Sequence, residues 1–423
     1  MVRNATPRKN SFAALKSGDF RLYFIGQLIS ISGTWMQNLA QGYLVFQMTQ
    51  SEAWLGVVAC AAGLPFVLLA PLAGAVVEQF PRRRLLIITQ IFQMCLAFIL
   101  AALTATGLVQ VWHIVVLAFL LGVTNAIDLP ARQSFVIEVV GGDLLQSGIA
   151  LNSVLTSASR VLGPMAAGLA LARFGPAACF LLNGISFIAV IAMLTIMHVP
   201  YAVEARRTMN PLDGLRQGLN FCRHHDTIMP LLLLAAIGGI SIVPIIQILP
   251  AFADVVLKSP TDGYAAITVA QGIGSVMAGV TVGWLSQRFG YGRLLAVTSV
   301  TATAATVLLS MQRTVPTAMV MTLFSGASMI MYFVCLNTSI QTLVPNEYRS
   351  RVLALYTLSF MGIAPFSALL LGFLASIFGT PPAMVLLALT GISGVAYVLI
   401  RWPSLLWIGV EQQAREAVSQ SSP

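Results

Sequence analysis

Charged residues are scarce in this chain: they make up 9% of its 423 residues, whereas hydrophobic residues make up 57%. Soluble globular domains carry about 25% charged residues, because their surfaces face water. The mean hydropathy of +0.86 agrees with this contrast. The composition therefore excludes a soluble globular protein and predicts an integral membrane protein that lies in a lipid bilayer.

Motifs for metal, nucleotide or covalent chemistry are also lacking. The five cysteines share no metal-ligand or redox spacing. The adjacent residues His224 and His225 would point apart on a helix, and no acid or cysteine at ligand spacing completes a metal site. No Gly-x-x-x-x-Gly-Lys-Ser/Thr loop is present, so ATP is not expected to drive the protein. We expect no metal site, no cofactor and no enzymatic activity.

Positive charge exceeds negative charge, and the formal net charge is +9. The basic residues fall in short clusters between apolar runs rather than in one patch, so nucleic-acid binding is not expected. Residues 1–20 are basic but lack an apolar core followed by a cleavage site, which argues against a cleaved signal peptide. Residues 12–16 would suit a short interfacial helix, although a frayed basic tail is favoured.

Long apolar runs occupy most of the chain. A hydrocarbon core about 30 Å thick requires roughly 20 apolar residues in helical form. Twelve runs meet this length, so the sequence predicts an all-α membrane protein with twelve transmembrane helices. The predicted spans are 20–48, 54–77, 85–106, 111–138, 145–172, 176–197, 228–254, 264–286, 293–311, 316–342, 352–377 and 380–402.

The twelve spans fall into two predicted six-helix bundles, because a polar stretch of mixed charge separates the sixth span from the seventh. A parallel pair of six-helix repeats around a midplane site is typical of secondary transporters that work by alternating access. The predicted parts are an N-terminal tail (1–19), a first bundle (20–197), a linker (198–227), a second bundle (228–402) and a C-terminal tail (403–423).

The fifth and eleventh spans repeat one pattern of small residues and proline. Arg160 is followed by Gly163, Pro164 and Gly168 in the fifth span, and the stretch 360–372 has a similar pattern in the eleventh. We expect Gly163, Pro164 and Gly168 to serve close helix packing, because small residues let helices approach in a membrane.

Basic residues lie almost entirely on one side of the predicted spans. Only Arg173, Lys258 and Arg313 fall in loops on the other side, and Arg160 lies inside a span. Cytoplasmic loops carry the excess of lysine and arginine in membrane proteins. Both termini are therefore predicted to be cytoplasmic.

Uncharged amides in the first span are candidates for substrate binding, because polar groups at membrane depth face protein or a water-filled cavity. They are Gln37, Asn38 and Gln41. Hydrogen bonding between helices would explain each of them equally well. Weaker candidates of the same kind are Gln247, Asn337, Gln341 and Tyr356.

Charged residues inside the spans are few, and each costs about 2.5–3.5 kcal/mol at a helix centre on insertion scales. Asp128 in the fourth span is the best candidate for a proton carrier, because the other acids lie at span ends or in loops. Arg160 would be its partner or an anchor for an anionic substrate. Arg132 follows Asp128 by one helical turn and would pair with it along the helix, which would leave Asp128 purely structural. Both interpretations stay open at this point.

Two arginine-rich loops stand at corresponding places in the two halves, one at 74–84 and one at 283–293. They resemble the loop signature of the major facilitator superfamily. The second copy lacks the acid of that signature, because Gln287 takes its place. The resemblance implies a role in conformational gating, with charge pairs that stabilise the outward-open state. The residues concerned are Gly74, Glu78, Arg82, Arg83, Arg84, Gly283, Arg288, Gly290 and Arg293.

A finer resemblance covers roughly residues 12–402. The run Asp128-x-Pro-x-Arg-Gln, the stretches 149–153 and 249–253, and Arg160-x-x-Gly-Pro resemble the bacterial exporters of enterobactin-type siderophores and drugs. This resemblance implies a protein of the bacterial cytoplasmic membrane that exports amphipathic small molecules in exchange for protons. We expect a monomer. The alternatives are an importer or uniporter with the same fold, and a non-transporting membrane sensor or scaffold.

Overall fold

The computed structural model describes residues 13–197 and 211–408, and within this range the side chains of residues 70–75, 78, 142, 143, 145, 146, 150, 211–215, 346 and 350 are outside the description. All regular elements in the described residues are helical. The predicted all-α fold is therefore confirmed.

The helices of the first half follow the predicted spans closely. They are α1 (Gly18–Thr49), α2 (Glu52–Gln79), α3 (Arg82–Ala105) and α4 (Val111–Ile196). Gly141 and Gly175 interrupt α4 with φ angles of 69° and 74°, a backbone conformation that glycine adopts without steric cost. These two glycines divide α4 into helices at 111–140, 142–174 and 176–196, which correspond to the fourth, fifth and sixth predicted spans.

The helices of the second half show two interruptions that the apolar runs did not predict. The seventh span consists of α6 (Ile228–Ser241), α7 (Ile245–Ala251) and the π-helical turn η2 (Phe252–Val256), and the eleventh consists of α11 (Asn346–Met361) and α12 (Ala364–Phe378). Pro244 and Pro365 stand at these breaks, because proline cannot donate the hydrogen bond that continues a helix. The remaining elements are α8 (Asp262–Phe289), α9 (Tyr291–Met311), α10 (Val315–Leu343), α13 (Thr380–Arg401) and η3 (Pro403–Trp407).

Two segments outside the spans are also helical. Residues 13–16 form the short 3-10 helix η1 (Ala13–Lys16), in which the buried Ala14 donates its backbone N–H to Ser147 Oγ at 3.0 Å. The expectation of a frayed tail is therefore wrong for these residues. Within the predicted linker, α5 (Pro211–Arg223) is a helix, and residues 198–210 lie outside the described part of the chain.

Ten segments of the described residues are long and apolar enough to cross a membrane. One of them, Ser147–Ile196, holds two helices separated at Gly175. The helix α1 is not among the ten, because its glutamines and other polar residues lower its hydropathy. With α1 and the divided segment, the helices account for the twelve predicted spans.

The chain forms two compact units. Unit 1 contains Met1–Ala40, Leu69–Val109 and Leu120–Thr208, and unit 2 contains Gln41–Leu68, Gln110–Phe119 and Met209–Pro423. Unit 2 therefore includes the second half of α1 and the first part of α2. The bundle limits given by the sequence stay a prediction.

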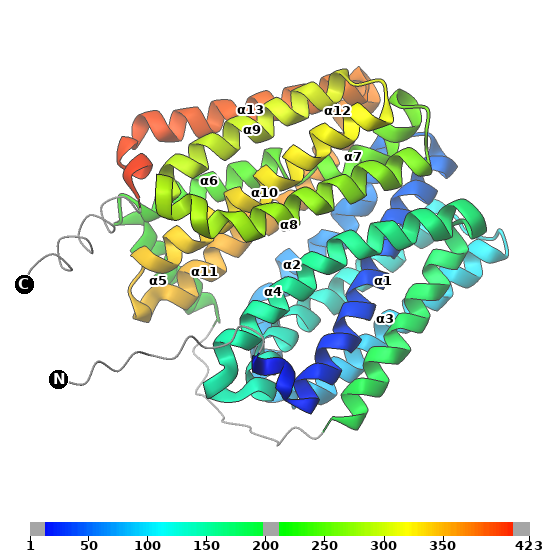
Figure 1. The fold of residues 1–423 in the computed structure, drawn as a ribbon, viewed down its shortest axis with the longest axis horizontal. Coiled ribbons are helices and arrows are strands. Elements are labelled where there is room, and N and C mark those ends of the chain that lie inside the picture. Colours follow the sequence, from blue (N-terminus) through cyan, green and yellow to red (C-terminus); the bar gives the residue numbers. More distant parts are fainter. Residues whose placement is uncertain (1–12, 198–210, 409–423) are drawn as a thin grey trace, which may run out of the picture. The chain divides into compact units, whose positions relative to one another are not determined.

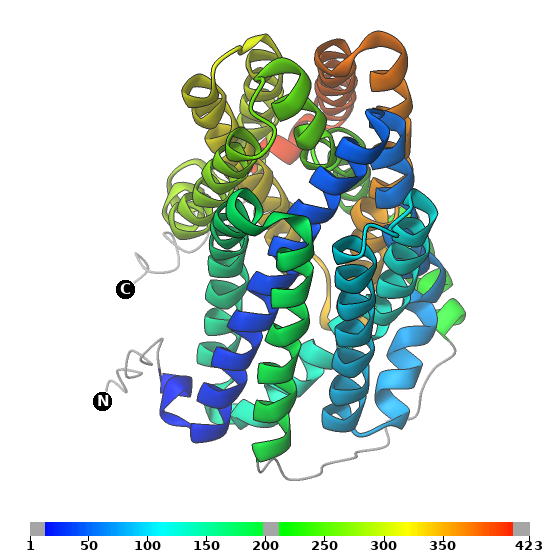
Figure 2. The same cartoon turned by 90° about the vertical axis from the view of Figure 1, so that its right-hand side faces the viewer.

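The core of unit 1 lies where α1, α3 and α4 meet, around Phe20, Tyr23, Leu86, Phe135 and Phe187. Figure 2 shows α1 in dark blue beside the last helical part of α4 in green. In unit 2, α10 packs against both α8 and α9 (Figure 1). A Cβ atom on Gly274 would lie 1.9 Å from the Leu323 carbonyl oxygen, and one on Gly326 would lie 2.1 Å from that of Gln271. The contact between α8 and α10 therefore requires glycine at both positions.

Candidate functional site

A buried carboxylate, Asp128, lies at the centre of a polar cluster in unit 1. It stands on the 111–140 part of α4, and its exposed fraction is 0%. Its Oδ1 atom accepts hydrogen bonds from Thr89 Oγ1 at 2.8 Å and from Gln90 Nε2 at 2.9 Å, both on α3. Its Oδ2 atom accepts from the Arg132 guanidinium, with which it forms an ion pair. A buried carboxylate requires such partners, because burial of an uncompensated charge is very costly.

The helix α1 supplies the third side of the cluster. Arg132 also reaches Gln27 Oε1 at 3.4 Å, and Ser30 Oγ lies 3.4 Å from Gln90 Oε1. Three buried atoms of the cluster, Tyr23 Oη, Gln27 Nε2 and Arg132 Nε, have no hydrogen-bond partner among the described residues. We call Tyr23, Gln27, Thr89, Gln90, Asp128 and Arg132 the Asp128 cluster. Its acid accepts from donors on α3 and α4, and α1 supplies the acceptor Gln27 Oε1 to Arg132.

Arg160 lies apart from this cluster. Its guanidinium carbon is 5.7 Å from the centre of the Trp35 ring on α1, and its Nε atom is buried without a hydrogen-bond partner in the described residues. Arg132, and not Arg160, is thus the observed ionic partner of Asp128. The interpretation of Arg160 as an anchor for an anionic substrate stays a prediction.

The glycine three residues after Arg160 brings α4 onto α1. A Cβ atom on Gly163 would lie 2.4 Å from Trp35 Cβ and 2.7 Å from the Ser32 carbonyl oxygen. Pro164 is buried and Gly168 is half-buried. This geometry supports the packing role expected for Gly163, since any larger side chain would separate the two helices.

The candidate amides of the first span differ in their surroundings. Gln37 is buried, and its Oε1 atom accepts a hydrogen bond from Asn183 Nδ2 at 2.7 Å. In this structure Gln37 therefore links α1 to the 176–196 part of α4. Asn38 is exposed and Gln41 is half-buried, so both remain candidates for contact with a substrate.

The candidates of the second half also differ. Gln247 on α7 is exposed. Tyr356 on α11 is buried and donates its hydroxyl to the Phe333 carbonyl oxygen at 3.0 Å. Asn337 is half-buried and accepts a hydrogen bond from Gln341 one helical turn later. Asn337 and Tyr356 therefore have partners within unit 2, whereas Gln247 is an exposed residue.

The first arginine-rich loop connects the start of α3 to two places on α4, one at Glu138 and one at the C-terminal end of the helix. Arg82 forms an ion pair with Glu138. Arg83 donates from Nε to the Leu194 carbonyl oxygen at 2.6 Å and from Nη2 to that of Thr195 at 2.5 Å. These carbonyls are at the C-terminus of α4, where a cation is favourable. Arg84 is exposed. The side chains of Gly74 and Glu78 lie outside the described residues.

The second arginine-rich loop makes ring contacts. The guanidinium carbon of Arg293 lies 4.6 Å from the Trp407 ring centre, and that of Arg288 lies 5.8 Å from Trp284. Gly290 joins α8 to α9 with a φ angle of 78°. No atom of the described residues lies within 4 Å of a Cβ atom placed on Gly283. The two loops, although related in sequence, therefore hold their arginines by different contacts.

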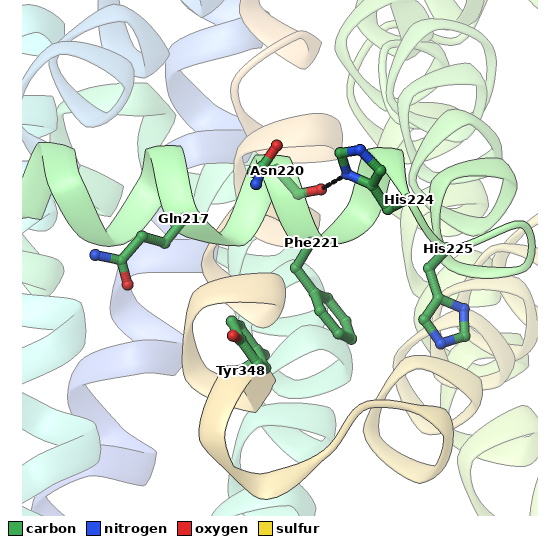
Figure 3. Close-up of a pocket in the computed structure, with 6 residues that line it drawn as sticks. All are labelled: Gln217, Asn220, Phe221, His224, His225 and Tyr348. Carbon is green, nitrogen blue, oxygen red and sulfur yellow. Dashed lines mark hydrogen bonds between the residues drawn. The ribbon is translucent and has the colours of Figure 1, made fainter.

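A cavity of 450 Å³ lies between α5 and α11, lined by Gln217, Asn220, Phe221, His224, His225 and Tyr348 (Figure 3). The rings of Phe221 and Tyr348 stack with their centres 4.4 Å apart and their planes 8° apart. His224 Nδ1 lies 2.8 Å from the Asn220 carbonyl oxygen. Within the described residues, no group of three His, Cys, Asp or Glu side chains could hold a metal ion. Because the rings of Phe221 and Tyr348 contact each other, the cavity lies at the packing contact between α5 and α11.

Sequence reasoning missed several members of these contacts. Thr89 and Gln90 stand side by side in the third apolar run, and Gln27 and Tyr23 are one helical turn apart in the first. Glu138, the partner of Arg82, closes the fourth run. Their signal is weak but present: a polar residue inside or at the end of an apolar run needs a partner on another helix.

A family described as transmembrane secretion effector matches residues 9–415 of the chain. The MFS-type transporter YfiS of Bacillus subtilis is 22% identical over 238 residues, which are 55% of this chain and 55% of YfiS. The staphyloferrin A transporter of Staphylococcus aureus is 26% identical over 176 residues, 41% of this chain and 44% of that protein. The aligned region thus spans about half the length of these two relatives or less.

Longer matches agree with this assignment. The multidrug efflux pump Tap of Mycobacterium tuberculosis is 24% identical over 412 residues, 93% of this chain and 95% of Tap. The crystal structure of the nucleoside transporter NupG has a TM-score of 0.73 at 14% identity, over 90% of this chain and 98% of NupG. The crystal structure of a D-xylose-proton symporter has a TM-score of 0.70 at 15% identity, over 92% of this chain and 98% of the symporter. The chain therefore belongs to the transmembrane secretion effector family and is a multi-pass membrane protein with the fold of the major facilitator superfamily.

Proposed function

We propose that this transporter exports amphipathic small molecules of siderophore-like or drug-like chemistry in exchange for protons. The observation that carries the proposal is the fully buried Asp128 carboxylate with its polar partners on α3 and α4. A titratable acid in a membrane span is by default a functional residue, because its burial is costly. The names of two relatives, a staphyloferrin A transporter and a multidrug efflux pump, support the substrate class.

Asp128 is the proposed proton carrier. Arg132 pairs with its charged form, and a weaker contact between the two groups at another step of the transport cycle would favour proton uptake. The weak second contact of Arg132 with Gln27 Oε1, at 3.4 Å, offers the guanidinium another acceptor on α1. Proton binding would thereby change the contact between α4 and α1.

The proposed substrate contacts are Asn38, Gln41, Gln247 and the guanidinium of Arg160. Arg160 has a buried Nε atom without a partner among the described residues, so it has hydrogen-bonding capacity for an anionic group of a substrate. The amides are uncharged, and the spans that carry them are rich in apolar residues. Such surroundings suit a substrate that combines apolar surface with few polar groups.

Alternating access is the proposed mechanism, and the first part of α2 provides a contact that would open. A Cβ atom on Gly56 would lie 2.7 Å from the Ala368 carbonyl oxygen on α12, and one on Gly63 would lie 2.2 Å from Pro365 Cγ. Thr380 Oγ1 donates to Glu52 Oε1 at 2.9 Å at the same end of α2. By the positive-inside rule this is the outer end, so a substrate leaving outward requires these contacts to separate.

The proposed location is the bacterial cytoplasmic membrane, with both termini in the cytoplasm and a monomer as the working unit. Cysteines placed at two exposed positions test the orientation: Lys258→Cys should react with a membrane-impermeant maleimide from outside, and Arg223→Cys only from inside. Reversed accessibility would contradict the proposed topology.

Transport in proteoliposomes tests the function itself. Ethidium efflux against its gradient should follow an imposed pH gradient with the wild type, and Asp128→Asn should lose this drive while keeping exchange of ethidium across the membrane. Accumulation in the opposite direction would identify an importer. Unchanged proton-driven efflux by a well-folded Asp128→Asn variant would remove Asp128 as the carrier.

A further inference from the structure

The hydroxyl of Thr89 lies between two acceptors. Its Oγ1 atom is 2.8 Å from Asp128 Oδ1 and 2.9 Å from the Leu86 carbonyl oxygen. Both distances are those of ordinary hydrogen bonds between oxygens. A threonine hydroxyl has one proton and two acceptor lone pairs, so it donates to only one of these oxygens at a time.

The charged state of Asp128 fixes one arrangement. A carboxylate can only accept, so Thr89 must donate its proton to Oδ1, while Gln90 Nε2 donates to the same oxygen at 2.9 Å. Arg132 donates to Oδ2. In this state the Leu86 carbonyl oxygen accepts no hydrogen bond from the Thr89 hydroxyl.

The neutral state permits the opposite arrangement without moving a heavy atom. A proton from water binds to Oδ1 and forms its O–H bond, and this new hydroxyl donates to a lone pair of Thr89 Oγ1. Thr89 keeps its own proton and turns it to the Leu86 carbonyl at 2.9 Å. Oδ1 still accepts from Gln90, and Oδ2 still accepts from Arg132. No buried group of this set loses its partner in either state.

The charged and titratable neighbours of Asp128 in the described residues do not accept a hydrogen bond from its protonated form. Arg132 on α4 has only donors, and α3 presents the neutral Thr89 and Gln90 to the acid. Tyr23 on α1 belongs to the same cluster, but its buried hydroxyl has no hydrogen bond to Asp128 or Arg132 in the described residues. Gln90 faces Asp128 with its amide N–H, which cannot accept the new proton. Within the described residues, Thr89 is therefore the acceptor available to a protonated Asp128.

We propose that Thr89 is a positioning residue for proton exchange: its hydroxyl reverses direction when Asp128 takes up a proton and so accommodates both states of the acid. This inference rests on the proposed function, because it assumes that Asp128 is the group that binds the proton.

Infrared spectroscopy of the full-length protein in lipid vesicles tests the inference without a substrate. On acidification the wild type should gain a protonated-carboxyl band that Asp128→Asn lacks. Thr89→Val removes the hydroxyl at constant shape and should shift this band to higher frequency, because the carboxyl O–H loses its acceptor. Thr89→Ser keeps a hydroxyl and should leave the band at the wild-type frequency.

Two further variants keep the result interpretable. Thr124→Val is the matched control, since the Thr124 hydroxyl bonds the Leu120 carbonyl at 2.7 Å and no other group among the described residues, and it should not shift the band. Thr89→Ala serves if the valine variant does not fold. An Asp128-dependent band that keeps its frequency in Thr89→Val and Thr89→Ala would overturn the role of Thr89 and leave the proposed carrier intact. Absence of any Asp128-dependent band would instead overturn the carrier itself.

Discussion

Asp128 and Arg132 form a buried ion pair one helical turn apart on α4, and Asp128 is the more enclosed of the two. A pair at this spacing is supported by the helix that carries both residues. Its energy nevertheless depends on the donors of α3, because the acid has more acceptor positions than one guanidinium fills. The pair is thus part of the contact between helices as well as part of α4.

Removal of one partner of this pair should destabilise the protein more than removal of both. Arg132→Gln leaves the buried carboxylate without its counter-charge, at a cost of about 3–5 kcal/mol in the free energy of unfolding. Asp128→Asn combined with Arg132→Gln leaves no unpaired charge and should recover much of that cost. Unfolding in mixed micelles, measured for the four proteins of a double-mutant cycle, gives the coupling energy. Additive costs would show that the two charges do not depend on each other.

Arg83 should stabilise the C-terminal end of α4. Arg83→Gln loses the cation at the carbonyls of Leu194 and Thr195, which is worth about 1 kcal/mol at a helix C-terminus. Hydrogen exchange of the peptide covering residues 190–196 should become several times faster in this variant. Arg84→Gln is the control, because Arg84 is the exposed neighbour in the same loop. Equal exchange in the two variants would mean that the contact with α4 contributes nothing.

The extent to which sequence predicted this structure follows from what an apolar run encodes. Run length predicted the transmembrane helices, including the separation of the fourth, fifth and sixth spans that the structure places at Gly141 and Gly175, because it is a property of the local chain. The pairing of Asp128 with Arg132 was also accessible, because their spacing on one helix is local.

The remaining contacts of the site depend on which helices are neighbours. Thr89 and Gln90 reach Asp128 from α3, and Glu138 reaches Arg82 from α4. The sequence of one apolar run does not determine which face of its helix packs against which other helix. The helix α5 was missed for a related reason: its sequence is polar, and its packing against α11 involves Gly218, whose Cβ atom would lie 3.0 Å from Arg351 Cβ.

Gly56 should be required for the contact of α2 with α12. Gly56→Val places a side chain where the Ala368 carbonyl oxygen stands 2.7 Å from a Cβ atom, so the helices must separate. Cys60 lies one turn further along the same face of α2 and is half-buried. In a background with Cys60 as the only cysteine, Gly56→Val should increase its reaction with an impermeant maleimide several-fold.

A glycine in open surroundings provides the control for this experiment. In the described part of the chain, no atom lies within 4 Å of a Cβ placed on Gly279 of α8, so Gly279→Val should leave the reactivity of Cys60 unchanged. If Gly56→Val also leaves it unchanged, the contact between α2 and α12 does not limit access to this part of the protein.

We expect Arg160 to select anionic substrates, because its guanidinium group is charged and because this planar group is held against the Trp35 ring. The guanidinium lies over the Trp35 ring, 5.7 Å from its centre, and lysine would keep the charge but lose the planar contact. We expect Arg160→Gln to lose transport of an anionic amphipathic dye while transport of ethidium, which is cationic, persists. Arg160→Lys should retain part of the anionic transport, and Trp35→Phe should retain most of it because a ring remains at that place.

Initial rates in proteoliposomes at several dye concentrations separate a loss of affinity from a loss of turnover, and an anchor predicts a raised KM. An equal loss for both dyes would mean that Arg160 supports the packing of α4 on α1 and does not bind the substrate.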